Sequence, residues 1–171
     1  MHKDLCISVV KSMNYASVIE TPIGRLSILA DEDFVHAVTF EEKDIAGLIE
    51  NELTIKGANQ LKAYFNGKLQ DFDFPMKQKG TEFQHEVWQN LLTIPFGETT
   101  SYAKFSTHNP LAIRAIAAAN GKNNIAIAVP CHRVIGSSGK LVGYAGGLWR
   151  KQWLLQHERE VAKKGQTELK F

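Results

Sequence analysis

The sequence is poor in cysteine and has no long apolar run. Only two cysteines, Cys6 and Cys131, occur in 171 residues, which excludes a disulfide framework and a paired-cysteine zinc or redox site. No stretch approaches the roughly 18 consecutive apolar residues of a membrane helix. Residues 1–10 lack the basic and apolar segments of a secretion signal. We therefore expect a soluble, cytoplasmic protein with no membrane partner.

Aspartate is missing from one half of the chain. Residues 81–171 contain no Asp and hold eleven Lys and Arg against six Glu, a net charge of +5. Residues 1–80 hold nine Lys and Arg against twelve Asp and Glu, a net charge of −3. The basic half would attract a polyanion such as nucleic acid. An incidental imbalance on solvated faces is the alternative, and charge alone does not choose between the two.

The composition is that of a globular protein, with 44% apolar and 22% charged residues. At roughly 150 residues per domain, the length allows one large domain or two small ones. A polar stretch without helical period, residues 76–80, follows Pro75 and favours two domains. We place them at residues 1–78 and 79–171.

In the first half, three β-branched and aromatic runs predict an antiparallel meander of strands. The predicted strands are Tyr15–Glu20, Gly24–Ala30 and Phe34–Phe40. Apolar residues at helical intervals predict a helix over 58–65 that ends at Asn66-Gly67 and covers the sheet.

In the second half, Thr81 opens a capping box and an apolar stripe that predicts a helix ending near Pro95. A short helix over 101–106 and a second one over 111–119, entered through Asn109-Pro110, predict a helix-turn-helix. The second helix consists mainly of alanine with one charge, Arg114. Such a smooth face can approach another surface closely; the alternative is a buried packing helix.

The end of the chain is predicted to contain one strand, one glycine-rich segment and one helix. The apolar residues 125–129 predict the strand, and the glycines of 136–147 indicate tight folding around a site. The last helix is predicted over 148–161 with its three leucines facing inward, and the polar tail from Lys163 is predicted to be loose.

A cysteine next to a histidine, Cys131-His132, is a candidate nucleophile with its base, because only the thiolate attacks and a neighbouring base or cation lowers its pKa. Neighbouring side chains of a straight strand point to opposite faces, so direct contact requires a turn. Pro130 before the pair and Gly136 after it are typical of a turn. The alternative is a small buried hydrophobe beside a polar turn residue.

Several ordered blocks of sequence carry a family resemblance. They are IPFGETTSY at 94–102, RAIAAANGKNN at 114–124, PCHRVIG at 130–136, LVGYAGG at 141–147 and LLQHE at 154–158, with TPIGRLSILAD at 21–31 and QLKAYFNGKL at 60–69 in the first half. With these blocks, nearly the whole chain resembles the O6-alkylguanine-DNA alkyltransferases, also called methylated-DNA-protein-cysteine methyltransferases. The resemblance implies an α/β protein: a ribonuclease-H-like amino-terminal domain and a helical, winged-helix-like (helix-turn-helix) carboxy-terminal domain.

The resemblance also implies direct DNA repair. Cys131 matches the residue that takes the alkyl group from O6 of guanine and keeps it as a thioether, so each molecule acts once and needs no cofactor. His132 matches the base that acts on the thiol through a bridging water, and Glu158 matches the carboxylate that orients the histidine. Tyr102 matches the tyrosine that helps to protonate the leaving guanine.

For DNA binding, Arg114 matches the arginine that fills the space left by a flipped nucleotide. The alanine-rich face that includes Ala115 matches the surface placed in the minor groove. Ser101 is expected at the same DNA interface, and Asn123 matches the asparagine that ties the cysteine turn to this helix. The expected partner is double-stranded DNA with O6-alkylguanine, bound by a monomer.

For the base pocket, the Val134 carbonyl matches the group that reads the guanine amino group. Tyr144 and Ala145 match the pocket wall, where some family members carry Ser in place of Ala145. O4-alkylthymine is a second candidate substrate. Four further residues are assigned only to surface, packing, cap or loop positions: Asn120, Asn124, Trp149 and Lys151.

The segment AKFSTHNPLAI at 103–113 is about two residues shorter than the family pattern, which predicts a shortened first helix of the helix-turn-helix. Cys6 and His36 fall short of the four ligands of a structural zinc site, so we expect no metal. A binding protein that senses alkylated DNA without repairing it is the main alternative function. Members of that kind lack the acceptor cysteine, which is present here as Cys131.

Overall fold

The computed structural model describes residues 14–106 and 112–169. The chain divides into two compact units, the first ending at Lys79 and the second beginning at Gly80. Each unit is described by itself.

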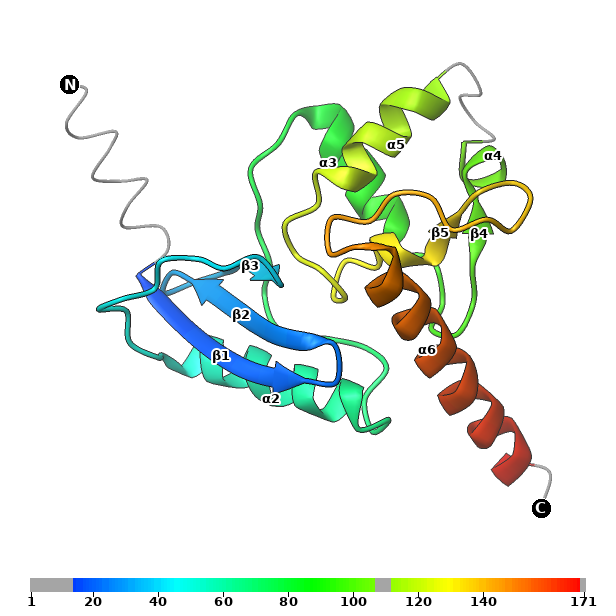
Figure 1. The fold of residues 1–171 in the computed structure, drawn as a ribbon. Coiled ribbons are helices and arrows are strands. Elements are labelled where there is room, and N and C mark those ends of the chain that lie inside the picture. Colours follow the sequence, from blue (N-terminus) through cyan, green and yellow to red (C-terminus); the bar gives the residue numbers. More distant parts are fainter. Residues whose placement is uncertain (1–13, 107–111, 170–171) are drawn as a thin grey trace. The chain divides into compact units, whose positions relative to one another are not determined.

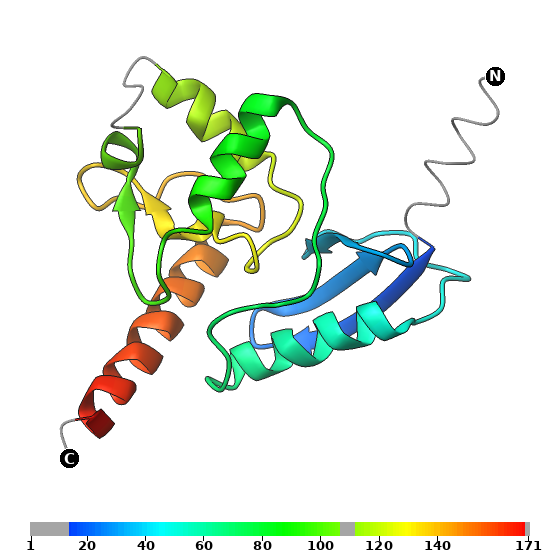
Figure 2. The same ribbon diagram turned by 180° about the vertical axis from the view of Figure 1, so that it is seen from behind.

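The first unit is a three-stranded antiparallel sheet with one helix along it (Figure 1). The strands are β1 (Tyr15–Thr21), β2 (Gly24–Ala30) and β3 (Val35–Thr39), in the order β1-β2-β3. The helix α2 (Glu52–Phe65) runs beside β1 and β2 in both views (Figures 1 and 2). The three predicted strands are confirmed, with ends that differ by at most one residue.

Helix α2 begins six residues before the predicted start. Asn51 caps it: Asn51 Oδ1 accepts from the Thr54 amide at 2.8 Å, and Thr54 Oγ1 accepts from the Asn51 amide at 3.0 Å. Gly57 lets the helix approach the sheet, because a Cβ there would lie 3.2 Å from the Ile28 side chain. The first turn was missed because no apolar stripe marks it.

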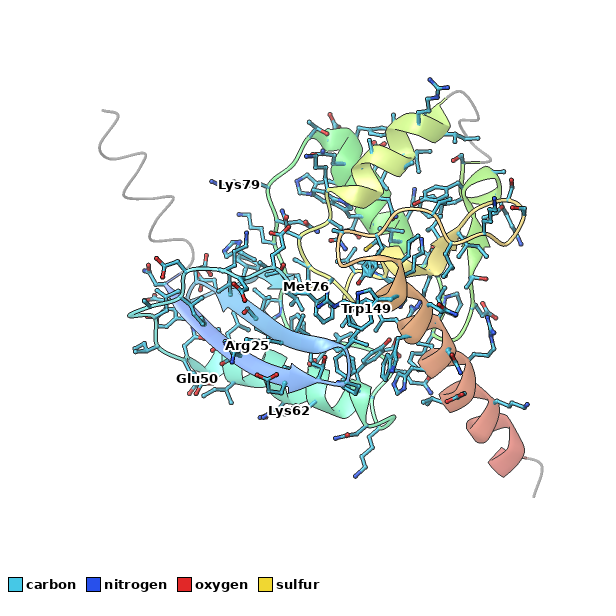
Figure 3. All side chains as sticks on the ribbon, viewed as in Figure 1. Arg25, Glu50, Lys62, Met76, Lys79 and Trp149 are labelled. Atoms are coloured by element: carbon cyan, nitrogen blue, oxygen red, sulfur yellow. The ribbon has the colours of Figure 1, made fainter. Side chains whose placement is uncertain are left out.

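The polar stretch at the predicted domain boundary is attached to the sheet. The Val35 amide donates to the Pro75 carbonyl at 2.9 Å, and the Lys77 amide donates to the Val35 carbonyl at 3.0 Å. Met76 lies beside β3 at this bridge (Figure 3). Residues 76–80 therefore do two things: they begin along the edge of the first sheet, and they then connect the first unit to the second.

The second unit contains four helices, a short 3₁₀ turn and two short strands among its described residues, which Figure 1 labels except for the turn. In chain order they are α3 (Glu82–Leu91), β4 (Thr100–Ser101), α4 (Tyr102–Phe105), α5 (Ile113–Gly121), η2 (Cys131–Arg133), β5 (Val134–Ile135) and α6 (Leu148–Leu169). Strands β4 and β5 pair in parallel, Thr100 with Val134 and Ser101 with Ile135. This pairing brings the start of α4 next to the residues that follow Cys131.

Helix α3 packs on α5. Val87, Ile116 and Ala119 form the buried contact, and Trp88 Nε1 donates to the Ala119 carbonyl at 2.9 Å. The capping box predicted at Thr81 is confirmed. Helix α4 has only four residues, as its shortened sequence predicts, whereas Asn109-Pro110 lies outside the described residues.

Three predictions for the end of the chain are wrong. Residues 125–129 form a turn instead of a strand, in which the Val129 amide donates to the Ile125 carbonyl at 3.1 Å and Ile127 has a φ of 71°. Helix α6 continues to Leu169 where a loose tail was expected, and Leu148 is 47% exposed instead of inward.

No helix among the described residues is long and apolar enough to span a membrane.

Candidate active site

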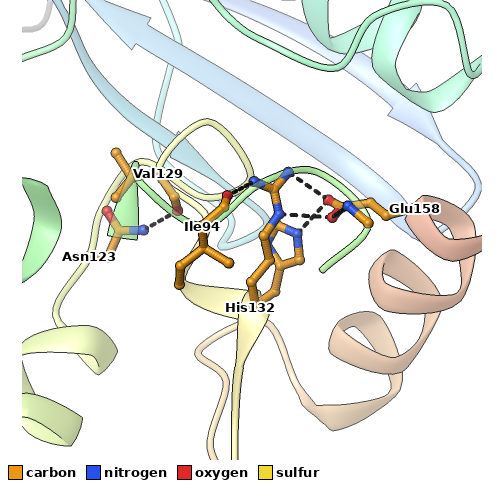
Figure 4. Close-up of polar contacts among 7 residues, drawn as sticks. Ile94, Asn123, Val129, His132 and Glu158 are labelled. Carbon is orange, nitrogen blue, oxygen red and sulfur yellow. Dashed lines mark hydrogen bonds and ion pairs between the residues drawn. The ribbon is translucent and has the colours of Figure 1, made fainter. Parts of the chain in front are cut away.

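One asparagine shapes the turn that leads to Cys131. Asn123 Nδ2 donates to the carbonyls of Val129 at 2.9 Å and Ile125 at 3.2 Å, and Asn123 Oδ1 accepts from the Ile125 amide at 3.1 Å. Figure 4 shows the Asn123 amide facing the Val129 carbonyl. A β-branched residue such as Ile127 rarely adopts a positive φ, so these bonds hold a strained turn in place. Cys131 is consequently presented from a fixed backbone.

The imidazole of His132 lies against the Glu158 carboxylate (Figure 4). Nε2 of His132 is 2.6 Å from Oε2 of Glu158, and both side chains are fully buried. Because a carboxylate only accepts, Nε2 carries the proton, and Nδ1 of the neutral ring has its lone pair available. No described residue hydrogen bonds to Nδ1. His132 therefore offers a buried base whose orientation Glu158 fixes.

Glu158 accepts hydrogen bonds from two segments, the cysteine turn and the loop before β4. Besides His132, Arg133 donates from Nε at 2.8 Å and from Nη2 at 3.2 Å, and the Gly97 amide donates at 3.3 Å. Burial alone would raise the pKa of Glu158. The charge that His132 carries when protonated, the hydrogen bonds from His132 and Arg133 and the positive charge of Arg133 outweigh that effect and hold the pKa far below its ordinary value. The carboxylate is thus ionised throughout the physiological range.

The loop before β4 completes this cluster. Arg133 Nη1 donates to the Ile94 carbonyl at 2.7 Å, and the Arg133 guanidinium lies 5.7 Å from the centre of the Phe96 ring. Gly97 has a φ of 81°, and a Cβ there would lie 2.8 Å from the Ala162 Cβ. The sequence analysis gave Arg133 no role, although it lies within the block 130–136.

The thiol of Cys131 is buried, and burial raises its pKa above the ordinary cysteine value. The hydrogen bond from Asn123 and the charge of Lys151 oppose this rise without cancelling it. The resting thiol therefore keeps its proton at neutral pH and needs a base to become nucleophilic.

Lys151 was assigned to the surface or to packing and is fully buried. Its Nζ donates to the carbonyls of Val142 at 2.8 Å and Gly143 at 3.2 Å, so it fastens the glycine-rich loop to α6. The spacing of Lys151, Leu154 and Glu158 places them on one face of a helix. Because Leu154 was predicted to face inward, this spacing could have indicated from the sequence that Lys151 faces inward too.

Tyr102 reaches the cysteine turn through α5. Its hydroxyl accepts from Nδ2 of Asn120 at 2.9 Å, and the same nitrogen donates to the Cys131 carbonyl at 3.3 Å. Burial raises the pKa of Tyr102, while the Asn120 hydrogen bond acts in the opposite direction. Ser101 caps α4 by accepting from the Lys104 amide at 3.0 Å.

The predicted pocket residues differ in exposure. Val134 is fully buried directly after the cysteine turn, and Ala145 is exposed. The Tyr144 hydroxyl is buried without a hydrogen-bond partner among the described residues. Burial and, to a lesser extent, the neighbouring Cys131 raise the pKa of Tyr144 well above its ordinary value.

Two of the predicted DNA contacts, Arg114 and Ala115, lie on the exposed side of α5. Arg114 and Ala115 are exposed, whereas Ile116 and Ala119 face α3. One side of α5 is therefore buried by packing and the other is exposed. Each of the two interpretations that its sequence left open describes one side of the helix. At the start of α6, Trp149 is 57% exposed (Figure 3).

In the part of the chain that the structure describes, no three His, Cys, Asp or Glu side chains are grouped as a metal site.

Comparison with known proteins identifies relatives of both units. The family model described as 6-O-methylguanine DNA methyltransferase, ribonuclease-like domain, matches residues 14–78. The one described as 6-O-methylguanine DNA methyltransferase, DNA binding domain, matches residues 82–160. Both the predicted resemblance and the predicted fold class are confirmed.

Individual relatives cover most of the chain. A Mycobacterium bovis protein named methylated-DNA--protein-cysteine methyltransferase is 55% identical over 157 residues, which cover 88% of this chain and 95% of the relative. A Methanosarcina acetivorans protein of the same name is 45% identical over 152 residues, covering 84% and 97%. The crystal structure of Mycobacterium tuberculosis OGT in complex with DNA is similar with a TM-score of 0.78 at 42% identity, covering 86% of this chain and 94% of that one.

We predict that Glu158→Gln lowers the free energy of unfolding of the second unit by about 3 kcal/mol at pH 7, because it leaves the buried Arg133 without its counter-charge. The pKa of Glu158 is lowered on folding, so its stabilisation is present above the ordinary carboxyl pKa of about 4.3 and is lost as the pH falls. The difference in the free energy of unfolding between the parent protein and Glu158→Gln should therefore shrink below about pH 4.

Urea unfolding followed by tryptophan fluorescence measures this difference, because all three tryptophans belong to the second unit. Glu160→Gln on the exposed side of α6 is the matched control and should change stability by less than about 0.5 kcal/mol. A difference for Glu158→Gln that stays constant down to pH 3 would contradict the assignment.

We predict that Lys151→Met moves the pH midpoint of Cys131 alkylation by iodoacetamide to higher pH, because the lysine charge favours the thiolate. The rate is measured by peptide mass spectrometry in a Cys6→Ser background. Lys140→Met removes an exposed positive charge before the same loop and should leave the midpoint unchanged. Equal midpoints for Lys151→Met and the parent protein would refute this role.

Proposed function

This chain belongs to the 6-O-methylguanine DNA methyltransferase family, and on that premise we propose that Cys131 is the cysteine that receives the alkyl group. The protein binds DNA and repairs it by moving an alkyl group onto a cysteine of its own. The observation that carries the assignment is a buried thiol directly followed by His132, whose ring Glu158 holds at 2.6 Å.

The first step is the activation of the thiol. Because burial raises the pKa of Cys131, the proton leaves only when a base accepts it. Nδ1 of His132 takes it through a bridging water, and the ionised Glu158 stabilises the imidazolium that forms. Arg133 keeps Glu158 ionised, so the carboxylate retains its charge while the histidine gains one.

The second step is the displacement itself. The Cys131 thiolate attacks the alkyl carbon attached to O6 of guanine; the carbon–sulfur bond forms, the carbon–O6 bond breaks, and its electron pair moves onto the guanine. Tyr102 donates a proton to the base, so that neutral guanine leaves. The thioether has no route to hydrolysis here, so each molecule reacts once and requires no cofactor or metal. O4-alkylthymine offers the same kind of electrophilic carbon.

The target base must leave the duplex for this geometry to work, because a buried thiol cannot reach an atom inside a stacked pair. We assign the exposed face of α5 to the minor groove. Ala115 and Ala118 allow close approach there, and Arg114 extends a long cation that fills the space left in the stack. Ser101, which caps α4, is assigned to the same DNA interface.

The flipped base would enter a pocket formed by Val134, Tyr144 and Ala145. All the proposed catalytic, DNA-binding and pocket residues belong to the second unit, so we assign residues 79–171 to DNA binding and alkyl acceptance. Residues 1–78 are assigned a supporting role, in a monomeric protein.

A non-catalytic sensor of alkylated DNA is the alternative function. Such a protein needs the pocket and the DNA-binding face but not an activated thiol. The hydrogen-bonded pair of His132 and Glu158 beside Cys131 favours transfer over sensing.

We predict that incubation with a duplex carrying one O6-methylguanine adds one methyl group, 14 Da, to the protein. The mass of the intact protein should saturate at one addition, and peptide mapping should place it on Cys131. Cys131→Ser should bind the duplex and gain nothing, because an alcohol is a much weaker nucleophile than a thiolate.

Cys6→Ser is the matched control and should gain the methyl group as the parent protein does. Tight binding of the lesion with no mass gain would support the sensor instead.

We predict that Arg114→Ala slows repair of duplex DNA by roughly 10-fold or more and leaves reaction with free O6-benzylguanine within about twofold, because the side chain acts only on the stacked duplex. Single-turnover rates with the two substrates measure this. Arg159→Ala removes the same charge from the exposed side of α6 and should affect neither rate. Equal losses with both substrates for Arg114→Ala would count against its insertion into the duplex.

A further inference from the structure

Asn120 is a buried amide that the reaction, as described above, does not use. It lies near the end of α5 with 5% of its surface exposed, and the sequence analysis assigned it to a cap or loop position. Its Oδ1 is buried with no hydrogen-bond partner among the described residues. An unpaired buried oxygen lowers stability, so a leucine of similar size would suit this position better if packing were its only role.

The hydrogen bonds fix the orientation of this amide. The Cys131 carbonyl only accepts, so the group that faces it at 3.3 Å is the Asn120 NH₂ and not the carbonyl oxygen. The same nitrogen lies 2.9 Å from the Tyr102 hydroxyl. Its second hydrogen is therefore donated to Tyr102, and the tyrosine oxygen is the acceptor.

This direction decides where the tyrosine proton points. A hydroxyl that accepts from Asn120 directs its own hydrogen elsewhere, and it is then available to another acceptor. If Asn120 were turned or replaced by a carboxylate, the tyrosine would donate to residue 120 and its proton would be held inside the protein.

The same bond gains strength during proton transfer. As Tyr102 gives up its proton, negative charge develops on its oxygen, and a hydrogen bond to a charged acceptor is stronger than one to a neutral acceptor. The Asn120 bond lowers the pKa of Tyr102, against the larger effect of burial. An interaction that is stronger in the transition state than in the ground state accelerates the reaction.

We propose that Asn120 is a positioning residue for alkyl transfer: its amide turns the Tyr102 proton toward the leaving guanine and stabilises the phenolate formed when that proton is given. The inference rests on the proposed function. By also holding the Cys131 carbonyl, one side chain fixes both the residue that receives the alkyl group and the residue that protonates the leaving base.

The test separates leaving-group protonation from thiol reactivity. In a Cys6→Ser background, Cys131 is alkylated either by a duplex with O6-methylguanine, whose base needs a proton, or by iodoacetamide, whose iodide needs none. Asn120→Leu should slow transfer from DNA on the order of 100-fold at saturating protein, and should leave the iodoacetamide rate within about twofold.

A double-mutant cycle with Tyr102→Phe identifies the partner. Once the hydroxyl is absent, Asn120→Leu should cause little further loss, since the two residues act through one bond. Asn120→Asp keeps the size of the side chain and should slow DNA transfer at least as much, and it carries the test if Asn120→Leu does not fold. Asn90→Asp, on the exposed side of α3, is its control and should transfer at the parent rate.

Equal slowing of both reactions by the Asn120 variants would overturn the proposal in favour of a structural role at Cys131. Full additivity with Tyr102→Phe would also overturn it. Absence of methyl transfer by the parent protein, with iodoacetamide still reacting, would instead overturn the proposed function and this inference with it.

Discussion

The arrangement of the second unit depends on one buried negative charge. Glu158 accepts hydrogen bonds from the neighbouring residues His132 and Arg133 and from the Gly97 amide, and these two segments and Glu158 itself are widely separated in the sequence. A buried carboxylate requires such partners, because removing it from water is costly unless charge and hydrogen bonds compensate. The need to satisfy Glu158 therefore brings the loop before β4, the cysteine turn and α6 together, and the same need orients the histidine.

The geometry of the proposed active site is maintained by side-chain amides where regular secondary structure is absent. Asn123 closes the turn before Cys131 with three hydrogen bonds and thereby holds Ile127 at a positive φ. Asn120 then links that turn to Tyr102. Both asparagines project from α5 or its end, so the helix that we assign to the minor groove also carries the supports of the chemical site on its other side.

The sequence was informative where local signals determine structure. The strands and the capping box of Thr81 depend on neighbouring residues. Short blocks of sequence predicted a site at Cys131, His132 and Glu158, and the structure places His132 and Glu158 in contact. Residues 125–129 show the limit: Ile125, Ile127 and Val129 alternate with alanine in the pattern of a strand, yet the side chain of Asn123 folds them into a turn. Only tertiary hydrogen bonds reveal this.

The buried hydrogen bonds of Lys151 and Asn120 were not predicted, for a related reason. A polar residue in a helix is expected in solvent, and its burial depends on acceptors that lie elsewhere in the chain. For Lys151 these are two loop carbonyls, and for Asn120 they are a hydroxyl and a carbonyl. Helix α6 was predicted too short because residues after 161 lack an apolar stripe, although alanine, lysine and glutamate favour helix without one.

Burial of the Cys131 thiol has a consequence for the lifetime of the protein. Peroxides and glutathione disulfide react with exposed thiolates, and a thiol that stays protonated and buried is a poor target for both. A protein that can use its acceptor sulfur a single time loses its whole capacity to any such side reaction. The closed, proton-retaining environment of Cys131 thus preserves an unused molecule against oxidants until the thiol meets its substrate.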